Sequence, residues 1–393
     1  MATDDFDLDW ADRLNGLRED WDVIQTLLPA GWQEQARRTG ALCRTRGFKE
    51  AASLLRVMLI HLVDGSLRET AVRARAGGLA DVSDVALLAR LRGCGEWFRW
   101  MGEQLSRRLT TTAREVWPGR RVRLVDATVV CEPGATGATW RLHYLLDLGS
   151  LACEQIQVTL PQEGETLTRF EVQAGDIVMA DRGLAHRRGI RHVIDRGGDV
   201  VVRANLVSVP LEDAPGQPFA LLPQLRLLKT GEVGQWSVFL RDPAGPIALR
   251  VCALKKSAEQ REKAQARLQR EAAHKQRQLR ADTLEAAGYM VVLTTLTTVS
   301  ARQVLELYRH RWQIELAFKR LKSLLTLGHL KKTDPQGAKA WLQGKLLVAA
   351  LIETLIVVGE RFSPWGYLLP VEQDSAMSLA RGFTHAKPAG SCH

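Results

Sequence analysis

Four residues with charged or phenolic side chains stand at helical spacing in the last third of the chain. Tyr308, Arg311, Glu315 and Lys322 are separated by three, four and seven positions. At about 100° per residue, these positions fall on one narrow face of a single helix. That face combines a carboxylate with two cations and a phenol, which suits an anionic polymer with a metal ion beside it. The plainer alternative is a solvated amphipathic helix in which Arg311 and Glu315 form an ordinary i,i+4 pair.

Two acids upstream are candidate partners of Glu315. Asp126 lies within a strand-like run, where a carboxylate on the apolar face is costly unless it is liganded. Asp181 ends a second buried strand-like run. If these strands are neighbours and the helix crosses their edge, the three acids converge, and divalent cations must then neutralise them. Oxygen ligands favour two Mg²⁺ or Mn²⁺ ions, with Asp126 bridging the pair and Asp181 and Glu315 each completing one site.

The first 115 residues predict an all-helical N-terminal domain. Apolar side chains recur at helical spacing through residues 51–63 and 85–91. Ser66 and Glu69 form a capping box that opens a short helix at residues 67–75, and a second helix is expected at residues 84–92. This outline resembles a helix-turn-helix, but the loop is longer than usual. DNA binding and a plain helical bundle are therefore both open interpretations.

From Arg121 the periodicity changes to that of an α/β domain. Three strand-like runs are followed by alternating helices and strands and then by the long helix. The predicted elements are strands at 122–130, 139–147 and 154–160, a helix at 165–172, a strand at 176–181, a helix at 185–194, and strands at 199–203 and 290–296. This order is that of an RNase H-like core formed by residues 116–204 and 289–330.

Residues 205–288 interrupt this core as a predicted insertion. Its first part, residues 206–254, contains short strand-like runs between turn signals and is expected to be rich in β-structure. Its second part, residues 255–280, is helical in pattern and carries nine cations against three glutamates. Such a helix is usually solvated, and contact with DNA phosphates is the alternative.

Residues 331–393 are expected to form C-terminal helices, which are candidates for dimerisation, and a disordered tail. The apolar run 346–358 is interrupted by Glu353 and Thr354 and is too short for a membrane span, so it predicts a buried helix and no membrane partner. The N-terminus lacks the features of a signal peptide, which indicates a cytoplasmic protein. The six cysteines form no metal-binding spacing.

The charge of the whole chain points to nucleic acid. Lys and Arg number 54 and Asp and Glu 44, which gives a net charge of +10 over 393 residues. A basic surface gains free energy by releasing counterions when it binds phosphates. DNA is therefore the first partner to consider.

Several segments together resemble bacterial DDE transposases of the insertion sequence 4 family. The resemblance covers residues 115–330 and rests on five segments, among which two Asp-bearing blocks precede the Tyr-Arg-Glu-Lys spacing. These are Val125 to Thr128, Trp140 to Tyr144, Asp176 to Gly183, Val201 to Asn205 and the Tyr308 to Lys322 segment.

The resemblance implies an enzyme that binds the terminal inverted repeats of an insertion sequence and then cuts and joins DNA. Asp126, Asp181 and Glu315 match the family's metal-binding triad. Residues matching those that hold the terminal DNA backbone are Tyr308, Arg311 and Lys322, and Lys319 is a further candidate for DNA contact. A homodimer on double-stranded terminal and target DNA is expected. In relatives a tryptophan of the insertion stacks on a flipped base, and Trp236 stands far upstream of Glu315 for that role.

Two other functions fit parts of the sequence. A non-catalytic DNA-binding protein, or a decayed element product, would need only the basic N-terminal helices. An RNase H-like nuclease would need the three acids but not Tyr308, Arg311 and Lys322.

Overall fold

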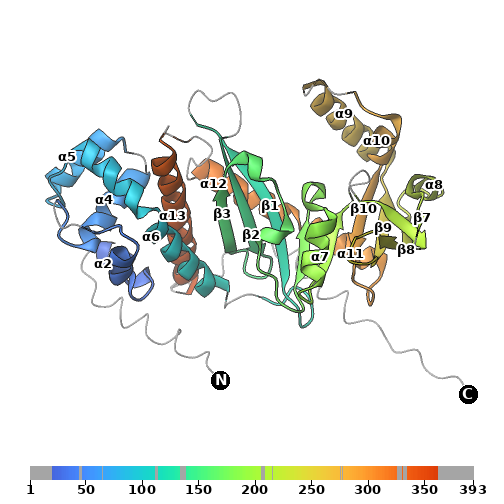
Figure 1. The fold of residues 1–393 in the computed structure, drawn as a ribbon, viewed down its shortest axis with the longest axis horizontal. Helices are drawn as coiled ribbons and strands as arrows, with labels where there is room; N and C mark the ends of the chain where they lie inside the picture. Colours follow the sequence, from blue (N-terminus) through green and yellow to red (C-terminus); the bar gives the residue numbers. More distant parts are fainter. Residues whose placement is uncertain are drawn as a thin grey trace, which may run out of the picture.

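The computed structural model shows a mixed α/β protein with a helical region beside a large sheet (Figure 1). Elements follow one another from this helical region, through the central strands, to the insertion at the far end (Figure 1). The structure describes residues 20–43, 47–63, 65–110, 114–132, 139–204, 209–214, 216–274, 276, 278–324, 330 and 334–361. The predicted C-terminal tail lies outside these residues.

The N-terminal region is helical, as the sequence predicts. Its helices are α2 (Asp20–Leu27), α3 (Trp32–Arg38), α4 (Ala51–Val63), α5 (Leu67–Ala76) and α6 (Asp84–Thr110). The capping box at Ser66 is confirmed, because its hydroxyl accepts from the Glu69 N–H and its own N–H donates to the Glu69 carboxylate. The second helix of the predicted helix-turn-helix does not end at residue 92. It continues as α6 for 27 residues.

Helix α13 (Pro335–Arg361) returns from the C-terminal side and packs into this helical region. Glycines permit the close approach: a Cβ on Gly95 of α6 would lie 3.4 Å from Ala340 of α13. Residues 335–359 of α13 are long and apolar enough to cross a membrane by length and composition alone. Its packing against α6, α4 and β3 is that of a core helix, and Ile352, Leu355 and Ile356 remain exposed.

The strands form one mixed sheet. The bounds of the first five are β1 (Val122–Val130), β2 (Trp140–Asp147), β3 (Cys153–Thr159), β4 (Ile177–Ala180) and β5 (Asp199–Arg203). The first three make an antiparallel meander, and β1, β4 and β5 run parallel in adjacent positions. The predicted adjacency of the strands bearing Asp126 and Asp181 is therefore confirmed. The helix expected at residues 165–172 is wrong, since only short 3₁₀ turns, Pro161–Glu163 and Leu167–Arg169, occur near it.

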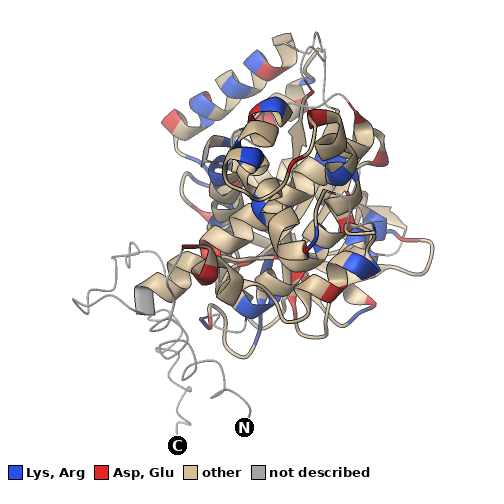
Figure 2. Ribbon diagram, turned by 90° about the vertical axis from the view of Figure 1, so that its left-hand side faces the viewer, with Lys and Arg blue, Asp and Glu red and all other residues tan. Residues whose placement is uncertain are grey.

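The insertion extends the same sheet. The strand order is β3-β2-β1-β4-β5-β10-β9-β8-β6-β7, with β10 antiparallel to both β5 and β9. The elements of the insertion are β6 (Leu211–Ala214), β7 (Gln217–Pro218), α8 (Leu221–Arg226), β8 (Val233–Leu240), β9 (Ile247–Lys255), α9 (Ala258–His274) and α10 (Ala281–Ala286), after which the chain returns to the core at β10 (Tyr289–Thr294). Helix α9 stands away from the body of the protein and carries charges of both signs (Figures 1 and 2). It is shorter than the predicted helical segment 255–280.

The sheet has two buried faces. Alternate residues such as Leu124 and Met179 pack with α11 (Ala301–Arg309) and α12 (Trp312–Leu324), and we call this the α12 face. The intervening residues, such as Val125 and Val178, pack with α7 (Arg187–Ile194) and form the α7 face. The alternation of strand side chains thus assigns every residue of β1 and β4 to one face or the other.

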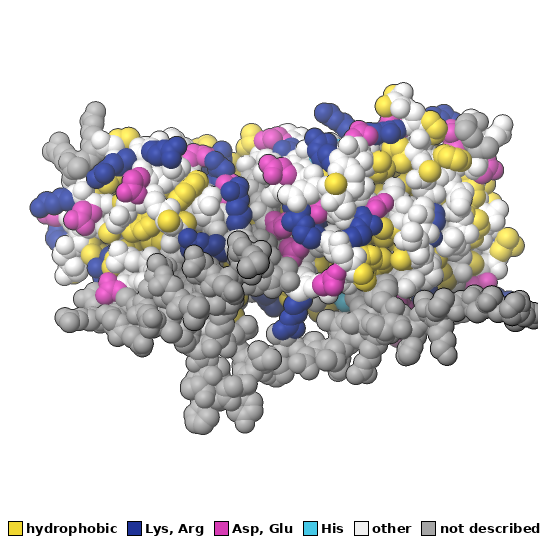
Figure 3. Space-filling model, turned by 90° about the horizontal axis from the view of Figure 1, so that it is seen from below, with side chains coloured by type: hydrophobic (Ala, Val, Ile, Leu, Met, Phe, Trp, Pro, Cys, Tyr) yellow, Lys and Arg dark blue, Asp and Glu magenta, His cyan; other side chains and the backbone are white. Residues whose placement is uncertain are grey.

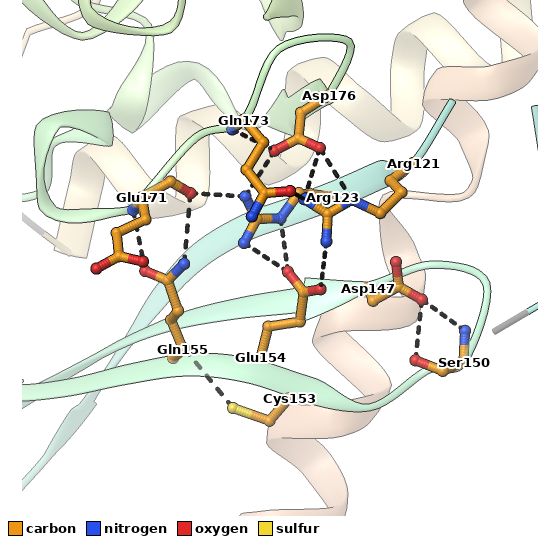
Figure 4. A network of polar contacts seen from close by, with 10 residues as sticks. All are labelled: Arg121, Arg123, Asp147, Ser150, Cys153, Glu154, Gln155, Glu171, Gln173 and Asp176. Atoms are coloured by element: carbon orange, nitrogen blue, oxygen red, sulfur yellow. Dashed lines mark hydrogen bonds and ion pairs between the residues drawn. The ribbon is translucent and has the colours of Figure 1, made fainter. Parts of the chain in front are cut away.

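The amino ends of the central strands are held by a buried network of ion pairs. Arg123 of β1 contacts Glu154 and Asp176, whose side chains are almost fully buried, and Arg121 contacts both acids from the outside (Figure 4). Nearby, Arg120 pairs with Asp199 at 2.6 Å. The molecule seen from below likewise carries cations and acids next to one another (Figure 3). Arginines at this edge therefore have carboxylate partners.

Candidate active site

Asp126 lies in the middle of β1, level with Asp181, which directly follows the carboxyl end of β4. The two strands pair in register up to Val125 and Ala180, so the next residue along each strand is one of the two acids. Asp126 lies opposite Tyr144 and Asp181 follows Met179 by two positions, which assigns both side chains to the α12 face. The end of β4 at Ala180 leaves the carboxylate of Asp181 free to face Asp126 and the helices.

Asp181 is held by donors from three elements. Its carboxylate accepts a hydrogen bond of 3.4 Å from the Tyr308 hydroxyl of α11. The guanidinium of Arg203, at the end of β5, forms an ion pair with it at 3.7 Å. Burial acts to raise the pKa of Asp181, but the N–H of Arg182 and the charges of Arg311 and Arg203 lower it below its ordinary value. Asp181 is consequently ionised at neutral pH.

Arg311 joins the other two acids. One guanidinium nitrogen lies 3.4 Å from Asp126 Oδ2, and another contacts the Glu315 carboxylate. Burial raises the pKa of Asp126 to about 6, although the Ala127 N–H and Arg311 oppose that shift. The Arg311 side chain is 16% exposed, whereas that of Glu315 is 59% exposed. The cation therefore lies inside the site, with Glu315 at its rim.

The single helix predicted across residues 308–322 is wrong. α11 ends at Arg309 and α12 begins at Trp312, and the two residues between them form a turn. Backbone bonds there span three residues, from Arg311 N–H to the Tyr308 carbonyl and from Gln313 N–H to the His310 carbonyl. The break places Tyr308 at the end of one helix and Glu315 in the first turn of the next. A carboxylate is favourable at that position of a helix.

The acids have the donor chemistry for hard cations but are not gathered into a preformed cluster. Within the described ranges, no three or more Asp, Glu, His or Cys side chains are grouped so that they could hold a metal ion. Arg311 contacts both Asp126 and Glu315, so it supplies the counter-charge between them. The carboxylate oxygens of Asp126, Asp181 and Glu315 are ligands that Mg²⁺ and Mn²⁺ accept.

The two predicted lysines stand along α12, away from this centre. Lys319 is exposed and Lys322 is half-buried. Neither forms an ion pair with Asp126, Asp181 or Glu315. At four and seven positions after Glu315, they share its side of the helix. They extend the cationic surface from the acids along the helix.

Sequence reasoning missed two charged neighbours of the acids. Arg203 lies in the segment Val201 to Asn205, which supports the family resemblance but indicates no role for this arginine. Its contact with Asp181 follows from the pairing of β4 with β5. Glu165 pairs with Arg141 at 3.7 Å and adds to the rise in the pKa of Asp126. The adjacency of β5 could have indicated Arg203. No pattern in the sequence indicated Glu165.

Trp236 lies on β8, at a distance from the acids. It is half-buried against the cluster of the α7 face. In the sheet, β8 is five strands from β1, which is about 24 Å at the usual spacing of about 4.8 Å. Within this chain, Trp236 is a packing residue of the insertion.

Known proteins resemble this chain over most of its length. Residues 117–351 match the family described as "Transposase DDE domain". The chain is 37% identical over 363 residues to the putative transposase InsL for insertion sequence element IS186A of Escherichia coli strain K12, covering 89% of this chain and 98% of that protein. It is also 37% identical over 364 residues to the transposase for insertion sequence element IS421 of Escherichia coli, with the same coverage. The chain therefore belongs to the DDE transposase family.

Proposed function

We propose that this protein is the transposase of a bacterial insertion sequence of the insertion sequence 4 type. It binds the terminal inverted repeats of the element, cleaves DNA there and transfers the ends to a target. The observation that carries the proposal is the meeting of Asp126 and Asp181 with Tyr308, Arg311 and Glu315 at one sheet edge. The order of β1 to β5 supports an RNase H-like core.

In this proposal Asp126, Asp181 and Glu315 would hold two divalent cations, Mg²⁺ or Mn²⁺, through their carboxylate oxygens. Two bound ions stabilise the attacking and leaving oxygens of an in-line phosphoryl displacement. The lowered pKa of Asp181 keeps it ionised for this task. Water attacks the phosphodiester at the element's end and displaces the 3′-oxygen, and the freed 3′-hydroxyl then attacks a target phosphate and displaces the 3′-oxygen of the target strand.

Cations and a phenol next to the acids position the DNA backbone. Arg311 offers a planar fork of donors that suits phosphate oxygens, whereas Lys319 and Lys322 act as point charges. Tyr308 is fixed by burial and by its bond to Asp181. Binding thereby places the scissile phosphate over the carboxylates.

The remaining assignments belong to the same proposal. Residues 1–115 bind the DNA ends, residues 205–288 are an insertion in the catalytic core, and residues 331–393 contribute to a homodimer on DNA. Supporting features are the net charge of +10 and the helical character of the N-terminal region. The protein acts in the cytoplasm, on the bacterial chromosome.

End cleavage by the purified protein tests the proposal. Labelled duplexes with the element's ends are incubated with Mg²⁺, and the products are resolved on a denaturing gel. Asp126→Ala, Asp181→Ala and Glu315→Ala are each expected to abolish cleavage and to leave binding detectable. Asp195→Ala is the matched control, because Asp195 is an exposed acid at the end of α7. Full cleavage by any triad variant contradicts the proposal.

A further inference from the structure

Three exposed arginines follow Asp181 closely in the sequence. They are Arg182, Arg187 and Arg188, and we call them the arginine patch. Throughout the described part of the chain, no carboxylate lies within ion-pair distance of their guanidinium groups. The other arginine of the same helix, Arg191, is different, because it pairs with Asp242 at 3.2 Å and also approaches Asp195. Arg187 and Arg188 therefore present positive charge to solvent without a carboxylate partner, while the charge of Arg182 also acts on the neighbouring Asp181.

The fold places this patch at the edge that carries the catalytic acids. Strands β4 and β5 are parallel neighbours joined by α7. In such a unit the helix starts near the carboxyl end of the first strand, where Asp181 stands. Arg187 and Arg188 are the first two residues of α7. The opposite edge carries Arg121 and Arg123, whose charges are paired with acids (Figure 4), and Arg120, which pairs with Asp199.

Arginines at this position do not help the helix. The start of a helix favours acids and disfavours cations, yet the first turn of α7 contains no acid. The residue before it, His186, forms no side-chain cap. Arg187 and Arg188 weaken the start of α7 and lie next to the catalytic acids. This combination indicates that they are retained for contact with a negatively charged ligand.

The patch and the predicted DNA-holding residues lie on different faces of the sheet. Leu307 and Ile314, in α11 and α12, pack on the α12 face, while Ile190 and Val193 of α7 pack on the α7 face. Asp126 and Asp181 belong to the α12 face, and Asp181 directly follows the carboxyl end of β4, the edge from which the chain continues to α7. If the scissile phosphate lies at the acids, the DNA on one side of the cut lies against α12. The DNA on the other side of the cut then lies near the start of α7.

We infer that the arginine patch binds the phosphate backbone of duplex DNA on the far side of the cut from the terminal repeat. Before cleavage that DNA is the flanking donor sequence, and after cleavage it is the target. Both have the same backbone chemistry. The inference rests on the proposed function, because it needs a DNA end held at Asp126 and Asp181.

Salt-dependent binding tests the inference. Arg187→Gln and Arg188→Gln are compared with Arg196→Gln, an exposed arginine just beyond the other end of α7, about 12 Å away at ~1.5 Å per residue. The first arm is a duplex containing the terminal repeat and its flank, the second is a pre-cut end without flank, and the third is strand transfer from pre-cut ends into a target duplex. Each patch variant should bind the first duplex several-fold more weakly, with a salt slope smaller by about 1.

The three arms separate the two sources of DNA. A loss in the first arm but not the second supports contact with flanking DNA, and a loss in strand transfer with normal binding of the pre-cut end supports contact with target DNA. An equal loss in the second arm, no loss in any arm, or an equal loss in Arg196→Gln overturns the inference. Wild-type protein that neither binds nor cleaves the ends contradicts the proposed function instead.

Discussion

At the scale of single residues, the positive charge inside the site comes from Arg311. Its guanidinium contacts Asp126 and Glu315 from two different nitrogens. A planar fork can meet two separate carboxylates at once, whereas a lysine ammonium is one compact charge on a flexible stem. The arrangement therefore depends on the shape of arginine as well as on its charge.

Arg311→Lys should consequently reduce single-turnover cleavage of DNA ends by at least tenfold, on the order of 1.4 kcal/mol in transition-state stabilisation. The variant keeps the charge but cannot reach both carboxylates in the same geometry. The measurement is the first-order rate of nicking at saturating protein and Mg²⁺.

Arg309→Lys is the matched control. Arg309 is exposed at the end of α11, two positions away, and touches none of the acids. We expect its cleavage rate to remain near that of the wild type. Equal rates in the two variants would show that only the charge at position 311 matters.

Residue types, their spacing and the family resemblance pointed to Asp126, Asp181, Glu315, Tyr308 and Arg311 as candidates, and the structure joins them through the Tyr308–Asp181 bond and the contacts of Arg311 with Asp126 and Glu315. The contacts among them were not predictable. The role of Arg203 depends on which strand lies beside β4, and that of Glu165 depends on an irregular loop. A pattern along the chain contains neither kind of information.

At the scale of elements, α13 carries a half-buried acid, Glu353, that faces the interior of the protein. Glu353 lines a cavity between α6, α12, α13 and the β2–β3 hairpin, together with Tyr144 and Glu103. Burial raises the pKa of Glu353 to about 7, opposed by the charge of Arg320 on α12. The proton is therefore held more tightly in the folded protein than in the unfolded chain, where the pKa is about 4.5.

This shift makes stability depend on pH. The contribution of Glu353 to the free energy of unfolding is complete below about pH 4.5 and is lost as the pH rises through about 7, on the order of 3 kcal/mol in total. Glu353→Gln imitates the protonated acid at every pH. The variant should therefore exceed the wild type in stability at about pH 8 and match it near pH 4.5.

Urea unfolding of both proteins at these two pH values measures the effect. Other titrating groups are shared by the two proteins and cancel in the difference between them. The same difference in stability at both pH values would contradict the assignment of this pH dependence to Glu353.

Elements with strong periodicity were predicted well, and those governed by backbone turns were not. The strand 199–203 has the predicted bounds, and the helix predicted at 185–194 begins two residues later, at Arg187. The break between α11 and α12 escaped prediction because His310 and Arg311 are ordinary helix-compatible residues, without glycine or proline. Tertiary contacts of Arg311 decide the geometry there.

At the scale of the whole molecule, the helical region is completed by a segment from the other end of the chain. α13 packs against α6 and α4, so residues 20–110 share one core with residues 335–361. Gly344 is a critical point of that packing. A Cβ there would lie 2.6 Å from Leu62 and 3.1 Å from Phe98, two side chains that are fully buried.

Two glycine-to-alanine variants of α13 should act in opposite directions. Gly344→Ala overpacks the interface and should lower the free energy of unfolding by about 1–3 kcal/mol. Gly359→Ala meets no atom within 4 Å and should raise helix stability by up to about 1 kcal/mol. Urea unfolding measures both free energies. If the free energy of unfolding of Gly344→Ala equals that of the wild type, the side chains packed against α13 can shift to accommodate the methyl group.

The overall assembly was the least predictable level. The sequence indicated a helical region, a core and an insertion, but the pairing of α13 with α6 joins residues more than two hundred positions apart. The joining of the insertion to the central sheet likewise depends on the pairing of β9 with β10, which are separated in the sequence by α9 and α10. The local periodicity of apolar residues indicates neither of these pairings.

The insertion begins after β5 and ends before β10, two adjacent strands of the core, so its length can change during evolution. β5 ends at Arg203 and β10 begins at Tyr289 beside it, so the excursion between them forms a cassette with both ends at one place. Such a cassette can be lengthened, shortened or exchanged while the acids keep their positions. A shorter version must still protect the edge of β10 that β9 now covers, because a bare strand edge invites aggregation.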